Sequence, residues 1–239
     1  MSRLEVFPIL GVPEVRPGDD LAGMIVDAAA GGDDTALADG DVVVVTQKVV
    51  SKAEGKLERI DPDDPRAHRA IVERESVRIL RRRGDLIIAE TKHGFVCANG
   101  GVDASNVGPG SGSLVTLLPA DPDASANRIR TQIRERFGGD VPVIVSDSFG
   151  RPWRWGIVDV ALGVSGILPL EDLRGQPDAD GRVMRTTVRA VADELASAAE
   201  LALGKTAGRP VALVRGANPP RGEGTIRDVV MAAGNDLFR

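Results

Sequence analysis

The sequence predicts an α+β fold, an irregular mixture of helices and strands. Short apolar runs such as Val42–Val45 and Val141–Val145 are typical of buried strands, and other segments carry apolar residues at helical spacing. The two kinds of segment follow one another without the steady alternation of a doubly wound sheet. A chain of 239 residues can bury a large core. We expect that core to be shared by two interleaved subdomains that together form one domain, residues 1–239.

The first half of the chain predicts two helices and three strands. Pro17–Ala30 opens with Gly-Asp-Asp and continues with apolar residues at helical spacing, which indicates a capped amphipathic helix. Val42–Val45 is a fully apolar strand that follows an Asp-Gly-Asp turn. Ala67–Arg83 is expected to be helical, and Asp85–Thr91 and Gly94–Val102 are expected to be strands joined by a short polar connection.

The second half of the chain predicts three helices, three strands and a glycine-rich segment. Apolar residues at positions i, i+4 and i+8 predict a helix over Ser125–Phe137, and the longest helix is expected over Arg182–Leu203 and ends before Gly204. The remaining elements are a glycine-rich segment at Val107–Ser113, strands at Leu114–Leu118, Val141–Val145 and Pro210–Val214, and a helix near Thr225–Ala233.

Composition excludes several classes of function. The formal net charge of −5 argues against a general nucleic-acid surface, although a local pocket can still be basic. Cys97 is the single cysteine, so a disulfide within the chain and a cysteine-based zinc site are both excluded. No apolar run approaches the length of a membrane span, and no signal-peptide pattern begins the sequence. We therefore expect a cytoplasmic protein that does not bind membranes or nucleic acids.

Three polar stretches follow apolar strands, where ligand sites often lie. Thr46–Lys52 offers two lysines and two hydroxyl groups suited to phosphate oxygens, or is simply a polar strand end. Asn99–Asn106 combines glycines with a carboxylate, which fits a cation site and equally fits a turn.

The third stretch, Ser146–Gly156, reads SDSFGRPWRWG and contains both tryptophans of the chain. Asp147 directly follows a buried strand, a common position for a metal-binding carboxylate, and Ser148 offers a hydroxyl group to a phosphate. Arg151 and Arg154 can balance negative charge, and Trp153 can stack on an aromatic ring. The alternative is a tryptophan pair that caps the core with arginines packed over it.

Taken in order, these stretches resemble the coenzyme F420-0:L-glutamate ligase family, the γ-glutamyl ligases of a deazaflavin coenzyme. The resemblance covers nearly the whole chain. It is carried by GVPEVRPGDDLA (11–22), GDVVVVTQKVVSKAEGK (40–56), ANGGVDASNVG (98–108), SDSFGRPWRWGIVDVALGVSGILPLEDLRGQPDADGR (146–182), VADELASAAELALGK (191–205) and PVALVRG (210–216). Some bacterial relatives continue into a nitroreductase-like domain, so residues 1–239 are expected to be a stand-alone ligase or a ligase domain.

The resemblance implies a mixed α/β ligase fold, often a homodimer, and a reaction in which GTP, F420-0 and L-glutamate give F420-1, GDP and phosphate. Further glutamates are added by some members. It implies Mg²⁺ or Mn²⁺ as the divalent metal, and a monovalent cation can be an additional cofactor. Metal-binding positions of the family fall on Asp103 and Asp147, with the hydroxyl of Ser148 beside them. Nucleotide-binding positions fall on Ile9, Leu10, Gly11, Val12, Gln47, Lys48, Lys52, Asn106, Ser148, Gly204 and Lys205.

Amide formation from a free carboxylate requires activation, for which an acyl phosphate formed from the F420-0 carboxylate and GTP is the expected route. Asp103 and Asp147 would hold the cations, and Lys52 would neutralise the remaining phosphate charge. Binding of the acceptor by Arg151, Arg154 and Trp153 is our own inference from their chemistry. Two alternatives stay open: a nucleotide-dependent amino-acid ligase with a different carboxylate acceptor, and a non-catalytic nucleotide-binding module.

Overall fold

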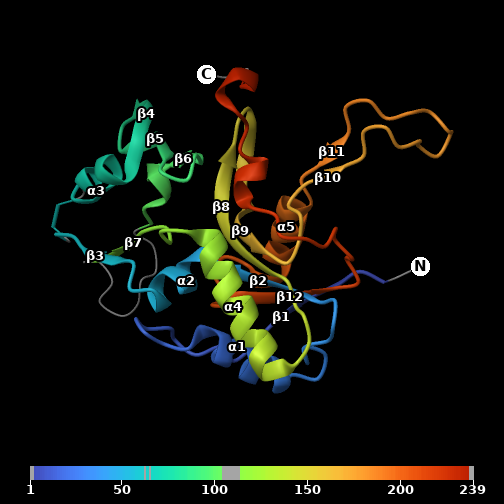
Figure 1. Cartoon of the computed structure of the whole chain (residues 1–239). Helices are drawn as coiled ribbons and strands as arrows, with labels where there is room; N and C mark the ends of the chain where they lie inside the picture. Colours follow the sequence, from blue (N-terminus) through green and yellow to red (C-terminus); the bar gives the residue numbers. More distant parts are fainter. Residues whose placement is uncertain (1–2, 62, 65, 104–113, 237–239) are drawn as a thin grey trace.

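A five-stranded sheet lies at the centre of the protein in this computed structural model, which describes residues 3–61, 63–64, 66–103 and 114–236 (Figure 1). Its strands lie in the order β1 (Glu5–Pro8), β12 (Val211–Arg215), β2 (Val42–Thr46), β8 (Val143–Arg151) and β9 (Arg154–Ser165). Neighbouring strands are antiparallel except for β2 and β8, which are parallel. The strands predicted at Val42–Val45, Val141–Val145 and Pro210–Val214 are therefore confirmed.

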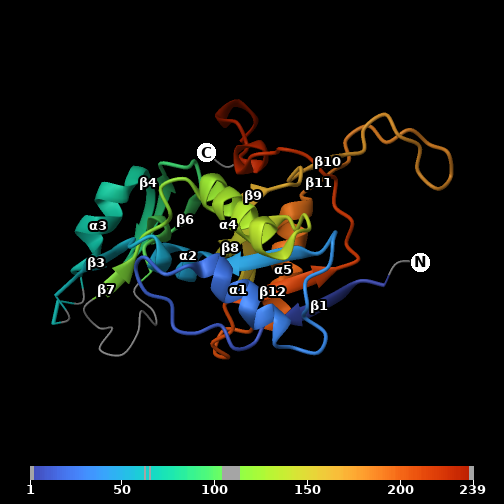
Figure 2. The same cartoon turned by 60° about the horizontal axis from the view of Figure 1, so that its bottom comes forward.

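Both faces of this sheet are covered, which explains why its central strands are apolar at every position. Val42 and Val44 belong to the core on one face, whereas Val43 and Val45 belong to the core on the other. Helix α5 (Val191–Leu203) packs on the first face. The second is covered by α1 (Leu21–Ala30), α2 (Gln47–Ala53) and α4 (Pro122–Phe137), and Figure 2 shows α1 and α4 in front of the sheet.

A smaller sheet lies to one side of the central one (Figure 1). It consists of β4 (Ser76–Arg83), β5 (Leu86–Thr91) and β6 (Val96–Ala98), with α3 (His68–Glu75) beside it. Ile71, Val72, Ile87, Ala89, Val102 and Val115 form its separate apolar cluster. The remaining elements are the pair β3 (Leu57–Arg59) and β7 (Leu114–Thr116), the pair β10 (Glu171–Asp172) and β11 (Val188–Arg189), and the 3-10 helices η1 (Asn99–Gly101), η3 (Ile226–Val229) and η4 (Ala233–Asn235).

The single helix predicted over Ala67–Arg83 is wrong. The chain is helical only from His68 to Glu75, and Ser76–Arg83 pairs with β5 as an antiparallel strand. Arginines have good helix propensity, but the alternative of completing a sheet over the small core decides the conformation here. The Oγ of Ser76 donates a hydrogen bond of 2.5 Å to the carbonyl oxygen of Val72, where the helix gives way to the strand.

The helix predicted over Arg182–Leu203 is also too long, since α5 begins at Val191. Val188 and Arg189 instead pair with Glu171 and Asp172 in an exposed ribbon that extends away from the central sheet (Figure 1). Among the described residues, the 16-residue α4 is the longest helix. The C-terminal helix predicted near Thr225–Ala233 is replaced by the two short 3-10 helices η3 and η4.

The α+β class is confirmed by helices and mixed sheets in irregular order. The division into interleaved subdomains stays a prediction, and the segment predicted at Val107–Ser113 lies outside the described residues. Within the described part of the chain, no helix has both the length and the apolar character needed to cross a membrane.

Gly163 marks the closest approach between β9 and the start of α4. A Cβ atom at this position would lie 2.3 Å from the backbone carbonyl carbon and oxygen of Pro122. We expect Gly163→Ala to destabilise the protein by about 3 kcal/mol, because neither strand nor helix can move without disturbing the core. For a chain of this length the melting temperature falls by roughly 6–12 °C. Gly150→Ala on β8 is the matched control, since a Cβ there meets nothing within 4 Å; equal melting temperatures for the two variants would contradict the prediction.

Candidate active site

A cavity of about 720 Å³ opens where the parallel strands β2 and β8 reach their carboxyl ends. Ligand sites favour this position because the connections that leave the two strands diverge there. Beyond the pair Thr46–Ser146, β2 turns into α2, so β8 continues with a strand partner on one side only, β9. We call this space the main cavity; its polar lining includes Glu14, Thr46, Lys48, Lys52, Asn99, Asp103, Ser146, Asp147, Ser148, Asp159, Glu200, Lys205, Thr206 and Arg209.

The stretch Ser146–Gly156 is a β-hairpin in which β8 extends to Arg151. The expectation that the strand ends at Val145 is therefore wrong, and Asp147 lies within the strand. The register shifts between Val145 and Ser146, where β9 has an additional residue opposite β8. Such bulges are common next to active sites because they redirect side chains. In this register Ser148 lies directly opposite Asp159 of β9.

Asp159 is the centre of a hydrogen-bond network in the cavity wall, and only 2% of the residue is exposed. Its carboxylate accepts hydrogen bonds from the hydroxyl of Ser146 at 3.1 Å and from that of Ser148 at 2.6 Å. Lys205 Nζ lies 3.0 Å from Asp159 Oδ1 and also donates to Ser148 Oγ. A buried carboxylate is stable only when it is paired in this way. Asp159 therefore fixes the positions of the Ser148 hydroxyl and the Lys205 ammonium.

Asp147 has a less favourable environment. Burial, together with the negative charges of Asp103 and Asp159, raises the pKa of its carboxyl group to about 7, against a backbone hydrogen bond from Ser148 and the charge of Lys205. Among the described residues, no lysine or arginine forms an ion pair with it. A carboxylate held near two others and lacking a direct counter-charge is the arrangement expected where a cation or a proton is to be bound.

Lysines from α2 face the acidic groups. Lys48 Nζ lies 2.8 Å from Asp103 Oδ2, and Lys52 Nζ lies 2.7 Å from Glu14 Oε1. Lys48 and Lys52 are four residues apart, so they lie on the same face of the helix. The main cavity thus combines carboxylates on β8, on β9 and at Asp103 with ammonium groups from α2 and from the segment after α5. Such a mixture is suited to phosphate groups accompanied by metal ions.

The donors present fit a hard divalent cation. Asp103, Asp147 and Ser148 offer oxygen atoms, the ligands that Mg²⁺ and Mn²⁺ prefer. Within the described ranges, however, no three acidic, histidine or cysteine side chains are grouped closely enough to hold a metal alone. A cation bound here would therefore need phosphate oxygens and water to complete its coordination sphere, as at magnesium sites in phosphoryl-transfer enzymes.

Some of the residues predicted to contact a nucleotide line the main cavity, and others lie elsewhere. Val12, Lys48, Lys52, Ser148, Gly204 and Lys205 line the main cavity. Ile9 is buried in the core, and Leu10 is exposed. Gln47 is buried, and its Nε2 donates to the carbonyl oxygen of Leu117 at 3.0 Å, which links α2 to the segment after β7. Asn106 lies outside the described residues, so its role stays a prediction, as do those of Gly11 and Gln47.

The arginines and tryptophans of the hairpin lie near its tip, away from the lining of the main cavity. Trp153 is 79% exposed and has a positive φ of 56°, and Trp155 is fully exposed. Arg151 donates a 2.8 Å hydrogen bond to the carbonyl oxygen of Trp155 across the turn. The tryptophans do not cap the core, which excludes that alternative. Substrate binding by Arg151, Trp153 and Arg154 stays a prediction.

Sequence reasoning missed Asp159 and Glu14. Asp159 had a visible signal, since a lone acid interrupts the apolar β-strand pattern of GIVDVALGV, where a carboxylate needs partners to be buried. Its pairing with Ser148 depends on the bulge and could not be read from the spacing. Glu14 lies in an irregular segment that no periodicity describes.

Comparison with known proteins agrees with this geometry. The model of the F420-0:gamma-glutamyl ligase family matches residues 10–216. The chain belongs to this family. It is 42% identical to the coenzyme F420:L-glutamate ligase of Methanothermobacter thermautotrophicus over 99% of both chains. It is 41% identical to that of Methanopyrus kandleri, over 100% of this chain and 99% of the relative. The Methanocaldococcus jannaschii ligase is 43% identical over 84% of this chain and 85% of its own. The alignment of this F420-0:gamma-glutamyl ligase family member with the Methanopyrus kandleri ligase therefore includes the segments that line the main cavity.

Proposed function

We propose that this chain is a GTP-dependent ligase that joins L-glutamate to coenzyme F420-0 through an amide bond, with release of GDP and phosphate. Two observations support the proposal together. The relatives that match nearly the whole chain are coenzyme F420:L-glutamate ligases. The main cavity, in turn, brings Asp103, Asp147 and Ser148 close to Lys48 and Lys205, the groups that phosphoryl transfer needs.

The proposed reaction has two steps. A carboxylate oxygen of F420-0 attacks the γ-phosphorus of GTP and forms the O–P bond of an acyl phosphate. The bond between the γ-phosphorus and the β–γ bridging oxygen breaks, and GDP leaves. The amine of L-glutamate then attacks the acyl carbon, phosphate leaves, and the nitrogen loses a proton. Lys48, Lys52 and Lys205 would neutralise the charge on the transferred and departing phosphate groups. The hydroxyl of Ser148 donates its hydrogen to Asp159, which would keep the Ser148 oxygen at a fixed position beside the phosphate groups.

We further propose that Asp103, Asp147 and Ser148 hold Mg²⁺ or Mn²⁺, because each presents an oxygen to the main cavity. When bound, such a cation withdraws negative charge from phosphate oxygens and aligns them. The protein's own contribution is to place the three oxygens on one wall and the lysines of α2 on another, so that a triphosphate would be held between them.

The direct test is to supply F420-0, GTP, L-glutamate and Mg²⁺ to the purified protein, and to follow products by mass spectrometry and phosphate release. The expected result is F420-1, with longer glutamyl forms if the enzyme acts repeatedly, and one phosphate released for each amide bond. A glutamylated product from another carboxylate, but none from F420-0, would favour a ligase of different acceptor specificity. GTP binding without phosphate release would favour a non-catalytic module and contradict the proposal.

We also propose a homodimer that uses the β8–β9 hairpin. The hairpin exposes Trp153, Trp155 and Ile157, the last of which is 52% exposed. Large apolar side chains gathered at an exposed tip are typical of association surfaces. By size-exclusion chromatography with light scattering, the original sequence is expected to be a dimer and the double variant Trp153→Ser, Trp155→Ser a monomer. Leu201→Ser is the control, since Leu201 is 85% exposed on α5, away from the hairpin. A double variant with the unchanged mass of the dimer would exclude this surface.

A further inference from the structure

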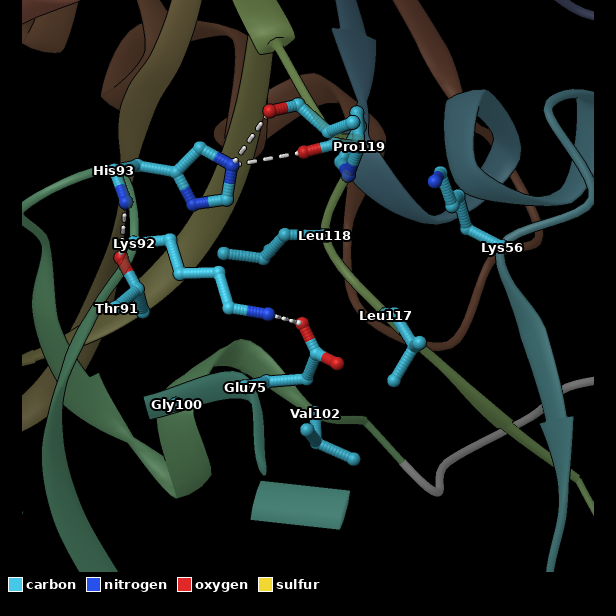
Figure 3. A pocket seen from close by; sticks show the side chains of 11 residues that line it. Lys56, Glu75, Thr91, Lys92, His93, Gly100, Val102, Leu117, Leu118 and Pro119 are labelled. Carbon is cyan, nitrogen blue, oxygen red and sulfur yellow. Dashed lines mark hydrogen bonds and ion pairs between the residues drawn. The ribbon is translucent and has the colours of Figure 1, made fainter. Parts of the chain in front are cut away.

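A second cavity, of about 320 Å³, lies beside the main one and has no part in the mechanism above. We call it the side cavity. It is lined by Lys56, Glu75, Thr91, Lys92, His93, Gly100, Val102, Leu117, Leu118, Pro119 and Ala120. Figure 3 shows Lys56 on one side of it and Lys92 and His93 on the other. Its volume is close to the lower end of typical ligand sites, which suits a molecule of the size of an amino acid.

The charged groups of the lining favour an anion. Glu75 lies 3.0 Å from Lys92, and hydrogen bonds from Lys92 and Arg74 outweigh the effect of burial, so that the pKa of Glu75 is below its usual range. The charge of Glu75 is thus neutralised by groups of the protein. Lys56 has no ion pair or side-chain hydrogen bond with any described residue. A lysine half-buried at a cavity without a protein counter-charge leaves the side cavity with an excess of positive charge.

The other walls suit a short aliphatic chain. Val102, Leu117 and Leu118 supply apolar surface between the two cationic ends. His93 Nε2 lies 2.9 Å from the carbonyl oxygen of Pro119 and 3.2 Å from that of Ala120, and therefore carries a hydrogen. His93 Nδ1 is buried and has no hydrogen-bond partner among the described residues. A buried ring nitrogen of this kind is explained if a ligand supplies the missing partner.

The two cavities share a wall. Val102 lines both, Gly100 lines the side cavity, and Gly101 and Asp103 line the main cavity. Both Gly100 and Gly101 have positive φ, so this segment follows a path that other residues adopt only with strain. A ligand in the side cavity is therefore adjacent to the segment that ends in Asp103, one of the carboxylates proposed to bind the metal ion.

We propose that the side cavity binds the side-chain carboxylate and methylene groups of a glutamyl unit, with Lys56 as the principal counter-charge. This inference rests on the proposed ligase function. Two sources share this chemistry: the incoming L-glutamate, and the glutamyl tail of an acceptor that has already been extended. Lys56 then determines which amino acid or acceptor is used, while the lysines of α2 hold the nucleotide.

The test replaces Lys56 by methionine, which keeps the aliphatic stem and removes the charge. Initial rates are measured with L-glutamate, GTP and acceptor varied in turn, and with either F420-0 or F420-1 as the acceptor. The loss of one charged hydrogen bond is expected to raise the KM for L-glutamate about tenfold or more, with the KM for GTP within about twofold. Lys56→Arg is expected to restore most of the affinity. Arg83→Met, on the exposed end of β4, removes the same charge from the same region and is the control.

Each outcome is decisive. A raised KM for L-glutamate with either acceptor identifies the incoming amino acid as the ligand. A raised KM for F420-1 alone identifies the glutamyl tail. Unchanged constants for both would overturn the inference, whereas absence of any glutamylated product from the unaltered protein would instead overturn the proposed function. If Lys56→Met does not fold, Lys92→Met provides the same comparison, because it leaves Glu75 to repel a ligand carboxylate.

Discussion

Replacing Asp147 by asparagine is expected to abolish metal-dependent ligation, with a loss of at least about 100-fold in kcat, and at the same time to stabilise the metal-free protein at neutral pH. The loss of activity follows from the removal of a charged oxygen ligand. The gain in stability follows because the carboxylate is buried beside Asp103 and Asp159, which raises its pKa to about 7. An amide of the same size does not carry that charge.

The ionisation of Asp147 makes the folded protein less stable as pH rises. The folded-state pKa of Asp147 lies above the unfolded value of 3.8, so between these values the folded state binds more protons and its stability falls as pH rises. The penalty is absent below the unfolded pKa of 3.8, grows as pH rises to about 7, and is complete above it. At pH 8 we expect Asp147→Asn to be more stable than the unaltered protein by about 1–3 kcal/mol, less than the shift alone gives, because cavity water solvates the carboxylate.

Urea denaturation with EDTA at pH 4.5 and pH 8 measures this difference in the free energy of unfolding, which should be clearly smaller at the lower pH. Adding Mg²⁺ with a nucleotide should then stabilise the unaltered protein but not the variant, since only a ligand that binds the folded state raises its stability. Near-normal activity in Asp147→Asn would contradict the proposed metal-binding role. Equal stability at pH 8 would contradict the raised pKa.

The second large effect is expected for Asp159→Asn. This change leaves a side chain of similar size but removes the charge that holds Lys205 at 3.0 Å. It also replaces one of the two oxygens that accept hydrogen bonds from Ser146 and Ser148 by an amide group that can only donate. Hydrogen bonds to charged groups contribute about 1.5–3 kcal/mol, which corresponds to a loss of about 10–100-fold in kcat/KM. Because we propose that Lys205 binds the nucleotide, much of the loss should appear as a higher KM for GTP, with the KM for L-glutamate unchanged.

Asp193→Asn is the matched control. Asp193 is also a partly buried carboxylate next to β9, and it accepts a 2.9 Å hydrogen bond from the backbone nitrogen of Ala161, but it does not line the main cavity. Its replacement should leave the KM for GTP unchanged, because its side chain is outside the main cavity. If the two variants have the same kinetic constants, Asp159 has a structural role only.

The main strands could be predicted from the sequence because burial on both faces leaves an unmistakable apolar run, as in Val42–Val45. The helix Ser125–Phe137 was predictable because Ile129 and Ile133 must face the same core. Two of the failures have the same physical origin. Ser76–Arg83 and Val188–Arg189 are polar segments whose conformation is decided by pairing with another strand, β5 for the first and β10 for the second, and local propensity does not contain that information.

The candidate site shows the same limit. Asp103, Asp147, Ser148, Lys48, Lys52 and Lys205 could be named from the sequence, and the fold brings all six to one cavity. Their distances could not be predicted, because they depend on the bulge in β9 and on where β2 ends. Asp159 was missed for this reason, as was the burial of Gln47 against Leu117.

Helix α2 determines the spacing of three positively charged lysine side chains. Its Lys48 and Lys52 face the main cavity, and Lys56, three residues after its end, reaches the side cavity. Gln47 and Ser51 both donate to the single carbonyl oxygen of Leu117, at 3.0 and 2.6 Å, so the helix is fastened at two points one turn apart. One short rigid body therefore sets the interval between three positive charges. A small change in its tilt would therefore move the lysines of the main cavity and of the side cavity together and keep the distance between them.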